Sequence, residues 1–178
     1  MDFNILYLID KLHNPFLDRI MIFITHLGDS GIFWIILALV LIYFKKTRKC
    51  GIHVIIALLI GVIIGNLLIK NIVARNRPCW IDESISLLIK NPDDYSFPSG
   101  HTLASFIAST MIFLHYKKWG IPCLILATLI AFSRLYLFVH FPTDVLAGII
   151  IGTIISASVF YLSDKYFNLK KEQTFDTI

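Results

Sequence analysis

Long apolar runs dominate this chain and leave few charged residues to interrupt them. A helix needs about 20 mostly apolar residues to cross the hydrocarbon core of a bilayer. Four ranges come close to that length: residues 52–68, 101–116, 121–139 and 145–162. With 57% hydrophobic residues and a mean hydropathy of +0.75, the chain is too apolar for an ordinary soluble domain of 178 residues. The pattern predicts an all-α, polytopic membrane helix bundle.

The N-terminal region is less regular than the rest. Residues 31–44 are apolar but short, and they reach the length of a span only if the helix starts near Ile24, which places Asp29 inside the span or at its edge. Residues 1–28 contain charges and an Asn14-Pro15 pair that should break a helix. We expect one or two amphipathic helices lying in the membrane interface there, with a tilted sixth span as the alternative.

The bundle would thus have five to six transmembrane helices in a single domain, residues 1–178. If the five apolar segments cross the membrane in turn, nine of the sixteen lysines and arginines share one side. They are Lys45, Lys46, Arg48, Lys49, Lys117, Lys118, Lys165, Lys170 and Lys171. By the positive-inside rule this side is the cytoplasm, so the polar motifs at the other ends of the spans face outward. The basic residues form no continuous stripe, so we expect no nucleic-acid partner.

The first polar motif contains two cations at the end of an apolar run. Lys70 and Arg77 are seven residues apart, which on a helix puts them on nearly the same face and about 10 Å apart along the axis. Two such cations can hold one phosphoryl group, the arginine as a planar fork and the lysine as a point charge. The alternative is a pair of interface anchors that extend toward lipid headgroups.

The second motif, Pro98-Ser99-Gly100-His101, stands immediately before an apolar run. Pro98 and Ser99 suit a helix start, Gly100 lets the backbone approach an anion closely, and the first N–H groups of the helix point toward it. The sequence predicts an anion-binding helix terminus here. The alternative is an ordinary N-cap by Ser99, with His101 hydrogen-bonded at the interface.

The third motif joins two apolar runs. Arg134 lies within an apolar run, which is costly unless it faces a polar cavity or a partner. The helix should end at His140, before Phe141-Pro142, and Asp144 should begin the next helix with Thr143 as its N-cap. Across that turn Asp144 can accept the imidazole N–H of His140 and leave the other nitrogen able to attack. A His–Asp pair that only joins a helical hairpin would leave Arg134 without a purpose.

Taken together, the three motifs carry a resemblance to a known family. Lys-x6-Arg-Pro, Pro-Ser-Gly-His and Ser-Arg-x5-His-x3-Asp resemble the motifs of the type 2 phosphatidic acid phosphatase superfamily, which includes membrane lipid phosphatases and soluble vanadium haloperoxidases. By motif the resemblance covers roughly residues 68–152. In length and layout the whole chain is similar to the small bacterial members that dephosphorylate undecaprenyl diphosphate or phosphatidylglycerophosphate.

The resemblance implies hydrolysis through a phosphohistidine. His140 would be the nucleophile, Asp144 would orient it, and His101 would protonate the leaving oxygen. The phosphoryl oxygens would be held by Lys70, Arg77, Ser99, Gly100 and Arg134. No metal or other cofactor is expected, because three cations and a helix terminus already supply a positive field. The three cysteines, at wide spacing, indicate neither a zinc site nor a disulfide framework.

The expected substrate is an isoprenoid or glycerophospholipid phosphate presented at the outer leaflet, with membrane lipids around it. Undecaprenyl diphosphate comes first on size and orientation, followed by phosphatidylglycerophosphate and phosphatidate; no residue discriminates among them. A transporter or lipid-binding membrane protein could use the same cations to hold an anion, but it gives no reason for two histidines and a carboxylate. Residues 71–98 could be a lid or a connector, and the oligomeric state is not indicated.

Overall fold

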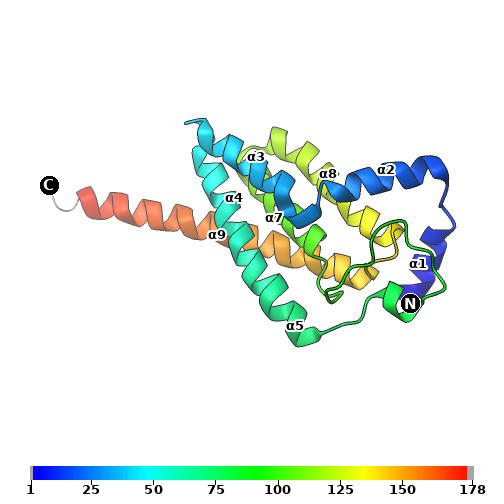
Figure 1. The fold of residues 1–178 in the computed structure, drawn as a ribbon. Coiled ribbons are helices and arrows are strands. Elements are labelled where there is room, and N and C mark those ends of the chain that lie inside the picture. Colours follow the sequence, from blue (N-terminus) through cyan, green and yellow to red (C-terminus); the bar gives the residue numbers. More distant parts are fainter. Residues whose placement is uncertain (1, 176–178) are drawn as a thin grey trace.

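Helices form all the regular secondary structure among residues 2–175, the part of the chain that the computed structural model describes; side chains are described to residue 163 (Figure 1). In chain order the helices are α1 (Asp2–Asp10), α2 (Pro15–His26), the 3-10 turn η1 (Asp29–Gly31), α3 (Ile32–Tyr43), α4 (Arg48–Gly61), the π-helical η2 (Val62–Ile69), α5 (Lys70–Val73), α6 (Pro78–Ile81), α7 (Gly100–His115), α8 (Lys117–Tyr136) and α9 (Pro142–Phe175). An irregular loop, residues 82–99, connects α6 to α7.

The predicted all-helical membrane bundle is confirmed. Among the described residues, three helical stretches are long and apolar enough to cross a membrane: Arg48–Ile81, Lys117–Tyr136 and Pro142–Ser163. The pair α2 and α3, bent by 42° at η1, would add a fourth. α7 has 16 residues, fewer than a full span usually needs. If α7 is counted as well, the bundle has five membrane spans, which is the lower end of the predicted range of five to six.

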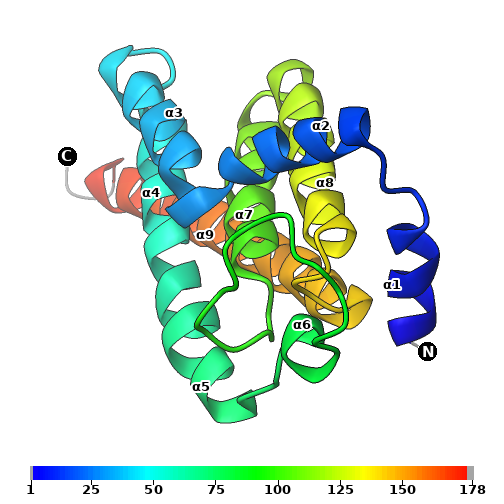
Figure 2. The ribbon, with the colours of Figure 1, turned by 45° about the vertical axis from the view of Figure 1, so that its right-hand side comes forward.

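α7 is the central helix of the bundle (Figure 2). Glycines on the neighbouring helices allow close approach to it, because small residues let helix backbones pack tightly in lipid. A Cβ added to Gly61 or Gly65 would collide with the side chains of Ile107 or Leu103. A Cβ added to Gly152 of α9 would lie 2.9 Å from the carbonyl oxygen of Leu103. The packing around α7 holds its N-terminal end, with the second motif, at a fixed place.

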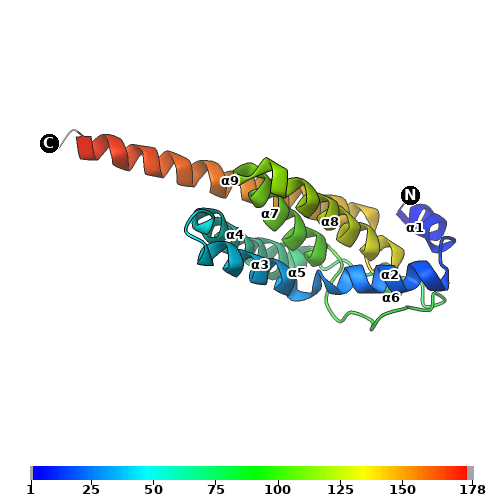
Figure 3. The ribbon, with the colours of Figure 1, turned by 90° about the horizontal axis from the view of Figure 1, so that it is seen from above.

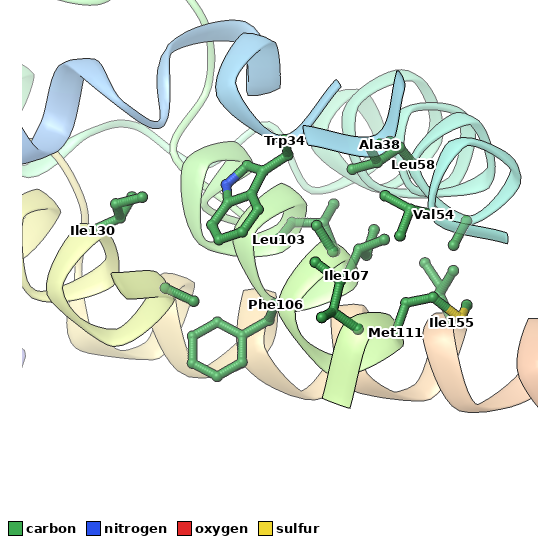
Figure 4. Close-up of a cluster of buried hydrophobic side chains, with 14 of the residues drawn as sticks. Trp34, Ala38, Val54, Leu58, Leu103, Phe106, Ile107, Met111, Ile130 and Ile155 are labelled. Carbon is green, nitrogen blue, oxygen red and sulfur yellow. The ribbon is translucent and has the colours of Figure 1, made fainter. Parts of the chain in front are cut away.

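The main apolar core lies where α3, α4 and α9 meet α7 (Figure 4). Trp34, Ile107 and Met111 are completely buried in it. The indole Nε1 of Trp34 donates to Ser105 Oγ at 3.0 Å, which satisfies the one polar group that Trp34 brings into the core. This core fixes the relative positions of the helices that surround the motif residues.

Two of the basic loops lie at one end of the bundle, as the sequence predicted. The Tyr116 hydroxyl, between α7 and α8, donates to the carbonyl oxygen of Lys46, between α3 and α4, at 2.8 Å. The second and third motifs lie at the other end, where α7 starts and where α8 connects to α9 (Figure 1). The predicted tail lysines, Lys165, Lys170 and Lys171, lie outside the side chains that the structure describes.

The N-terminal region forms two helices, α1 and α2, which agrees with the prediction of one or two helices in residues 1–28. Pro15 begins α2, and Asn14 Oδ1 caps it by accepting the N–H of Leu17 at 3.0 Å. α1 lies at the end of the molecule opposite the last turns of α9 (Figure 3). Whether α1 and α2 lie in the membrane interface stays a prediction.

Candidate active site

A cavity of about 430 Å³ lies at the end of the bundle where α7 begins. Six of the predicted site residues line it: Lys70, Arg77, Gly100, His101, Arg134 and His140. Two others, Ser99 and Asp144, are not in its lining and are fully buried. The fold therefore brings three motifs that are far apart in sequence to one place.

Lys70 and Arg77 lie on different elements, so the prediction that one helix carries both is wrong. The chain leaves α5 at Ala74, which has a left-handed φ of 46°. Pro78 disfavours helical geometry for the residue before it, and Arg77 is extended at φ −77° and ψ 153°. Both cations are nonetheless buried, which excludes the alternative of interface anchors. They meet at Asp94, where Arg77 Nη2 lies 2.6 Å from Oδ1 and the Lys70 ammonium contacts Oδ2.

Asp94 places a carboxylate between two cations that were predicted to bind phosphate. Its backbone carbonyl also accepts Arg77 Nε at 2.7 Å. Burial alone would raise the pKa of the Asp94 carboxyl, but the hydrogen bond from Lys70 and the charges of Arg77 and Lys70 lower it to about 2. The group is thus an anion at neutral pH. The loop of residues 82–99 thereby covers the cation pair.

His140 lies in the turn between α8 and α9 and is buried. Arg77 Nη1 donates to the Val139 carbonyl at 2.7 Å and lies 3.1 Å from His140 Nε2. Because a guanidinium only donates, Nε2 is the acceptor and the ring hydrogen sits on Nδ1. Burial, followed by the charges of Arg77 and Arg134, holds the pKa of His140 well below its usual value. The ring is therefore neutral, and Nε2 carries the lone pair.

The predicted direct hydrogen bond between His140 and Asp144 is not formed. His140 Nδ1 lies 3.6 Å from Asp144 Oδ2, and Ser96 stands between them. Ser96 Oγ donates to Asp144 Oδ2 at 2.5 Å and lies 3.4 Å from His140 Nδ1, so it can accept the ring hydrogen.

Two helix boundaries explain this difference. α8 ends at Tyr136, earlier than predicted, because Phe138 has a left-handed φ of 58°. α9 begins at Pro142, so Thr143 is inside the helix and not its N-cap. Asp144 Oδ2 turns back to accept the N–H of Phe141 at 2.8 Å, which satisfies one of the unpaired donors at the start of α9.

Arg75, to which the sequence assigned no role, binds Asp144 from a second side. Its Nη1 lies 2.6 Å from Asp144 Oδ1, and its Nη2 lies 3.0 Å from Asp2 Oδ2. The guanidinium also stacks over the Phe141 ring, 4.0 Å from the ring centroid. A fully buried carboxylate needs an opposite charge, and Arg75 supplies it.

Arg134 lies in the last turn of α8, close to α2. Its Nη1 donates to Thr25 Oγ1. Its Nε is buried and has no hydrogen-bond partner among the described residues. A buried donor without a partner is unusual, so this N–H is suited to an oxygen of a bound anion in the cavity.

The second motif starts α7 as predicted, with Gly100 as the first helical residue. Ser99 is at the N-cap position but makes no side-chain cap; its Oγ instead accepts the Thr102 hydroxyl at 3.0 Å. His101 is not simply hydrogen-bonded at an interface. Its Nε2 lies 2.8 Å from Asp29 Oδ1, and His26 Nδ1 lies 2.7 Å from Asp29 Oδ2.

Sequence reasoning missed four residues that contact the predicted ones: Asp29, Arg75, Asp94 and Ser96. Asp29 carried a signal, because a charge at the edge of an apolar span is costly and is by default a functional candidate. Arg75, Asp94 and Ser96 lie in the polar stretch between two spans, where a charged or hydroxyl residue is ordinary.

Comparisons with known proteins identify the family of this chain. A model of the PAP2 superfamily matches residues 50–167. An undecaprenyl-diphosphatase of Sulfolobus acidocaldarius is 37% identical over 141 residues, covering 79% of this chain and 68% of that protein. The undecaprenyl-diphosphatase BcrC of Bacillus subtilis is 34% identical over 154 residues, covering 85% of this chain and 78% of that protein.

A solved structure shows the same fold. The crystal structure of a transmembrane PAP2-type phosphatidylglycerolphosphate phosphatase from Bacillus subtilis superposes with a TM-score of 0.76 at 26% identity, covering 92% of this chain and 85% of that one. The family match covers more than half of the chain and includes all three motifs in full. The chain therefore belongs to the PAP2 superfamily and is a multi-pass membrane lipid phosphatase.

Proposed function

We propose that this protein hydrolyses the terminal phosphate of an isoprenoid diphosphate at the extracytoplasmic face of the membrane, through a phosphohistidine at His140. Undecaprenyl diphosphate is the preferred substrate. The observation that carries the proposal is the composition of the cavity. One part of its lining holds three buried cations and two histidines, and the rest is mainly apolar.

The apolar lining suits a lipid tail. It comes from α3, α4, η2 and α7 and includes Ile35, Ile55, Leu59, Val62 and Ile107. The polar and apolar parts belong to one cavity, so a phosphate headgroup can reach the cations while the chain attached to it stays among apolar side chains. A water-soluble phosphate ester would gain nothing from that second part.

In the first step, Nε2 of His140 attacks phosphorus and the bond from phosphorus to the leaving oxygen breaks. His101 transfers a proton to that oxygen. The phosphoryl group displaces the Asp94 carboxylate from Lys70 and Arg77. Those cations and Arg134 hold its oxygens, where charge increases in the transition state.

Ser96 and Asp144 support the nucleophile as its charge changes. When Nε2 forms its bond to phosphorus, the imidazole becomes positive, and the Nδ1–H is held by the Ser96 oxygen next to the Asp144 carboxylate. In the second step, a water molecule attacks phosphorus, the bond from phosphorus to Nε2 breaks, and His101 accepts the proton of the water. Inorganic phosphate is released, and His140 is neutral again.

The choice of substrate rests on similarity and size. The two relatives described above are named for undecaprenyl diphosphate, whereas the superposed structure is named for phosphatidylglycerolphosphate. We therefore keep phosphatidylglycerophosphate, and after it phosphatidate, as alternatives. The orientation rests on the basic loops at the end opposite the cavity.

The test is phosphate release by the purified protein in detergent, compared by kcat/KM for undecaprenyl diphosphate, phosphatidylglycerophosphate and phosphatidate. We expect the highest value for undecaprenyl diphosphate. H140A should release no phosphate from any of them, while H13A, which changes a histidine outside the cavity, should retain activity. A higher kcat/KM for a glycerophospholipid would make that lipid the preferred substrate. Full turnover by H140A would exclude a phosphohistidine at His140.

A further inference from the structure

We propose that Asp29 is a positioning residue for His101: its carboxylate holds the imidazole in place and favours the protonated ring from which the leaving oxygen takes its proton. The inference rests on the proposed function, because it assigns a support to the proton donor of that reaction. Asp29 lies outside all three motifs, in the turn η1 between α2 and α3.

Both oxygens of the Asp29 carboxylate are engaged by imidazoles. Oδ1 lies 2.8 Å from His101 Nε2, and Oδ2 lies 2.7 Å from His26 Nδ1. The His101 side chain is 20% exposed, whereas that of His26 is 60% exposed. Of the two contacts, the one to His101 is the more shielded from water, so it is the stronger electrostatically.

The backbone conformation around Asp29 brings its carboxylate to His101. Ser30 has a left-handed φ of 51°, a conformation that costs free energy for a residue other than glycine, and Gly31 follows with a φ of 67°. Gly28 precedes Asp29, and a Cβ there would lie 2.7 Å from His101 Cδ2. The turn thus brings its backbone against the imidazole ring and aims the carboxylate at Nε2.

The charges around His101 give Asp29 its role. The charged groups that face His101 from neighbouring elements are Arg134 of α8, Arg77 before α6, and Asp29. Burial of the ring and the two arginines disfavour a positive imidazolium, and Asp29 is the one of the three charged groups that favours it. A proton donor must hold its proton until the leaving oxygen takes it. With Nε2 bonded to Asp29, Nδ1 is the ring nitrogen left to carry the proton that is transferred.

Two substrates whose leaving groups differ in their need for a proton distinguish a role of Asp29 in proton transfer from a purely structural role. The alkoxide that leaves from phosphatidate needs a proton, whereas p-nitrophenolate leaves p-nitrophenyl phosphate without one at neutral pH. D29N keeps the size of the side chain and its ability to hydrogen-bond but removes the charge. We expect D29N to lower kcat/KM for phosphatidate by about 10- to 100-fold, and for p-nitrophenyl phosphate by no more than about threefold.

The variants H101A and D29N/H101A complete the test. If Asp29 acts through His101, the double variant is no slower with phosphatidate than H101A alone, because residues that act as a unit are not additive. D82N is the matched control, since Asp82 accepts a hydrogen bond from Tyr7 at 2.7 Å in an exposed position away from the cavity. It should match the wild type with both substrates.

Three results would overturn the inference: an equal loss by D29N with both substrates, no loss with either, or additive losses in the double variant. An equal loss of kcat/KM with both substrates would mean that Asp29 only maintains the shape of the turn. A wild-type protein that hydrolyses neither phosphatidate, p-nitrophenyl phosphate nor undecaprenyl diphosphate would instead contradict the proposed function. The two failures are therefore distinguishable.

Discussion

Three carboxylates, each from a different part of the chain, set the state of the basic side chains at this site. Asp144 could be predicted from the sequence, because it stands four residues after His140 and a tight turn must bring the two close. Asp94 and Asp29 could not, since they are 24 and 72 residues from Lys70 and His101, the partners they contact. The charge of Asp29 at the edge of an apolar span marks it as a functional candidate, but its partner depends on a bend between two helices. The partners of Asp94 depend on a loop that crosses the end of the bundle.

The Asp94 carboxylate and a phosphoryl group need the same two cations, so they must compete. We expect D94N to bind vanadate, a phosphate mimic, more tightly than the wild type. The expected fall in the inhibition constant is about fivefold, which corresponds to about 1 kcal/mol for a half-exposed ion pair. The measurement is inhibition of phosphate release at neutral pH, where the low pKa of Asp94, about 2, keeps the wild-type carboxylate charged.

D93N is the matched control, because Asp93 is its exposed neighbour in the same loop. It should leave the inhibition constant unchanged. If D94N binds vanadate as weakly as the wild type or more weakly, Asp94 does not compete for the cations and instead helps to hold them in place.

At the scale of helices, the apolar runs predicted the existence and order of the elements better than their ends. α8 ends and α9 begins earlier than expected, because left-handed φ at Phe138 closes the turn within a few residues. Such a conformation is held by packing on both sides of the turn, and sequence periodicity does not report it. The boundaries matter here, because they decide that Ser96 lies between His140 and Asp144.

The packing of α9 and η2 on α7 can be tested at two glycines. A Cβ on Gly152 would meet backbone atoms of α7, which cannot move without shifting the helix. A Cβ on Gly65 would meet the tip of the Leu103 side chain, which can rotate away. We expect G152A to lower Tm in detergent more than G65A does, with a cost of about 1–3 kcal/mol for G152A. Equal Tm values for the two variants would contradict this account of the α9 contact.

In the molecule as a whole, the cavity and the basic loops lie at opposite ends of the bundle. The cavity lies at one end, and the basic loops joined by Tyr116 and Lys46 lie at the other. On the positive-inside rule we propose that the cavity faces away from the cytoplasm.

Cysteine labelling in intact cells tests this orientation. Cys50 and Cys79 are buried, so new cysteines are needed at exposed positions, in a C123A background. S86C, in the loop over the cavity, should react with an impermeant thiol reagent, and K45C, in a basic loop, should react only after the membrane is opened. The reverse pattern would place the site in the cytoplasm.

The most direct measurement of the central claim is to trap the phosphorylated protein. The wild type is mixed with undecaprenyl diphosphate, quenched in alkali because phosphohistidine is acid-labile, digested, and analysed by mass spectrometry. We predict a phosphate on the peptide that contains His140, and none on that peptide from H140A. Steady turnover with no phosphate on His140, or with a phosphate on another residue, would contradict the account.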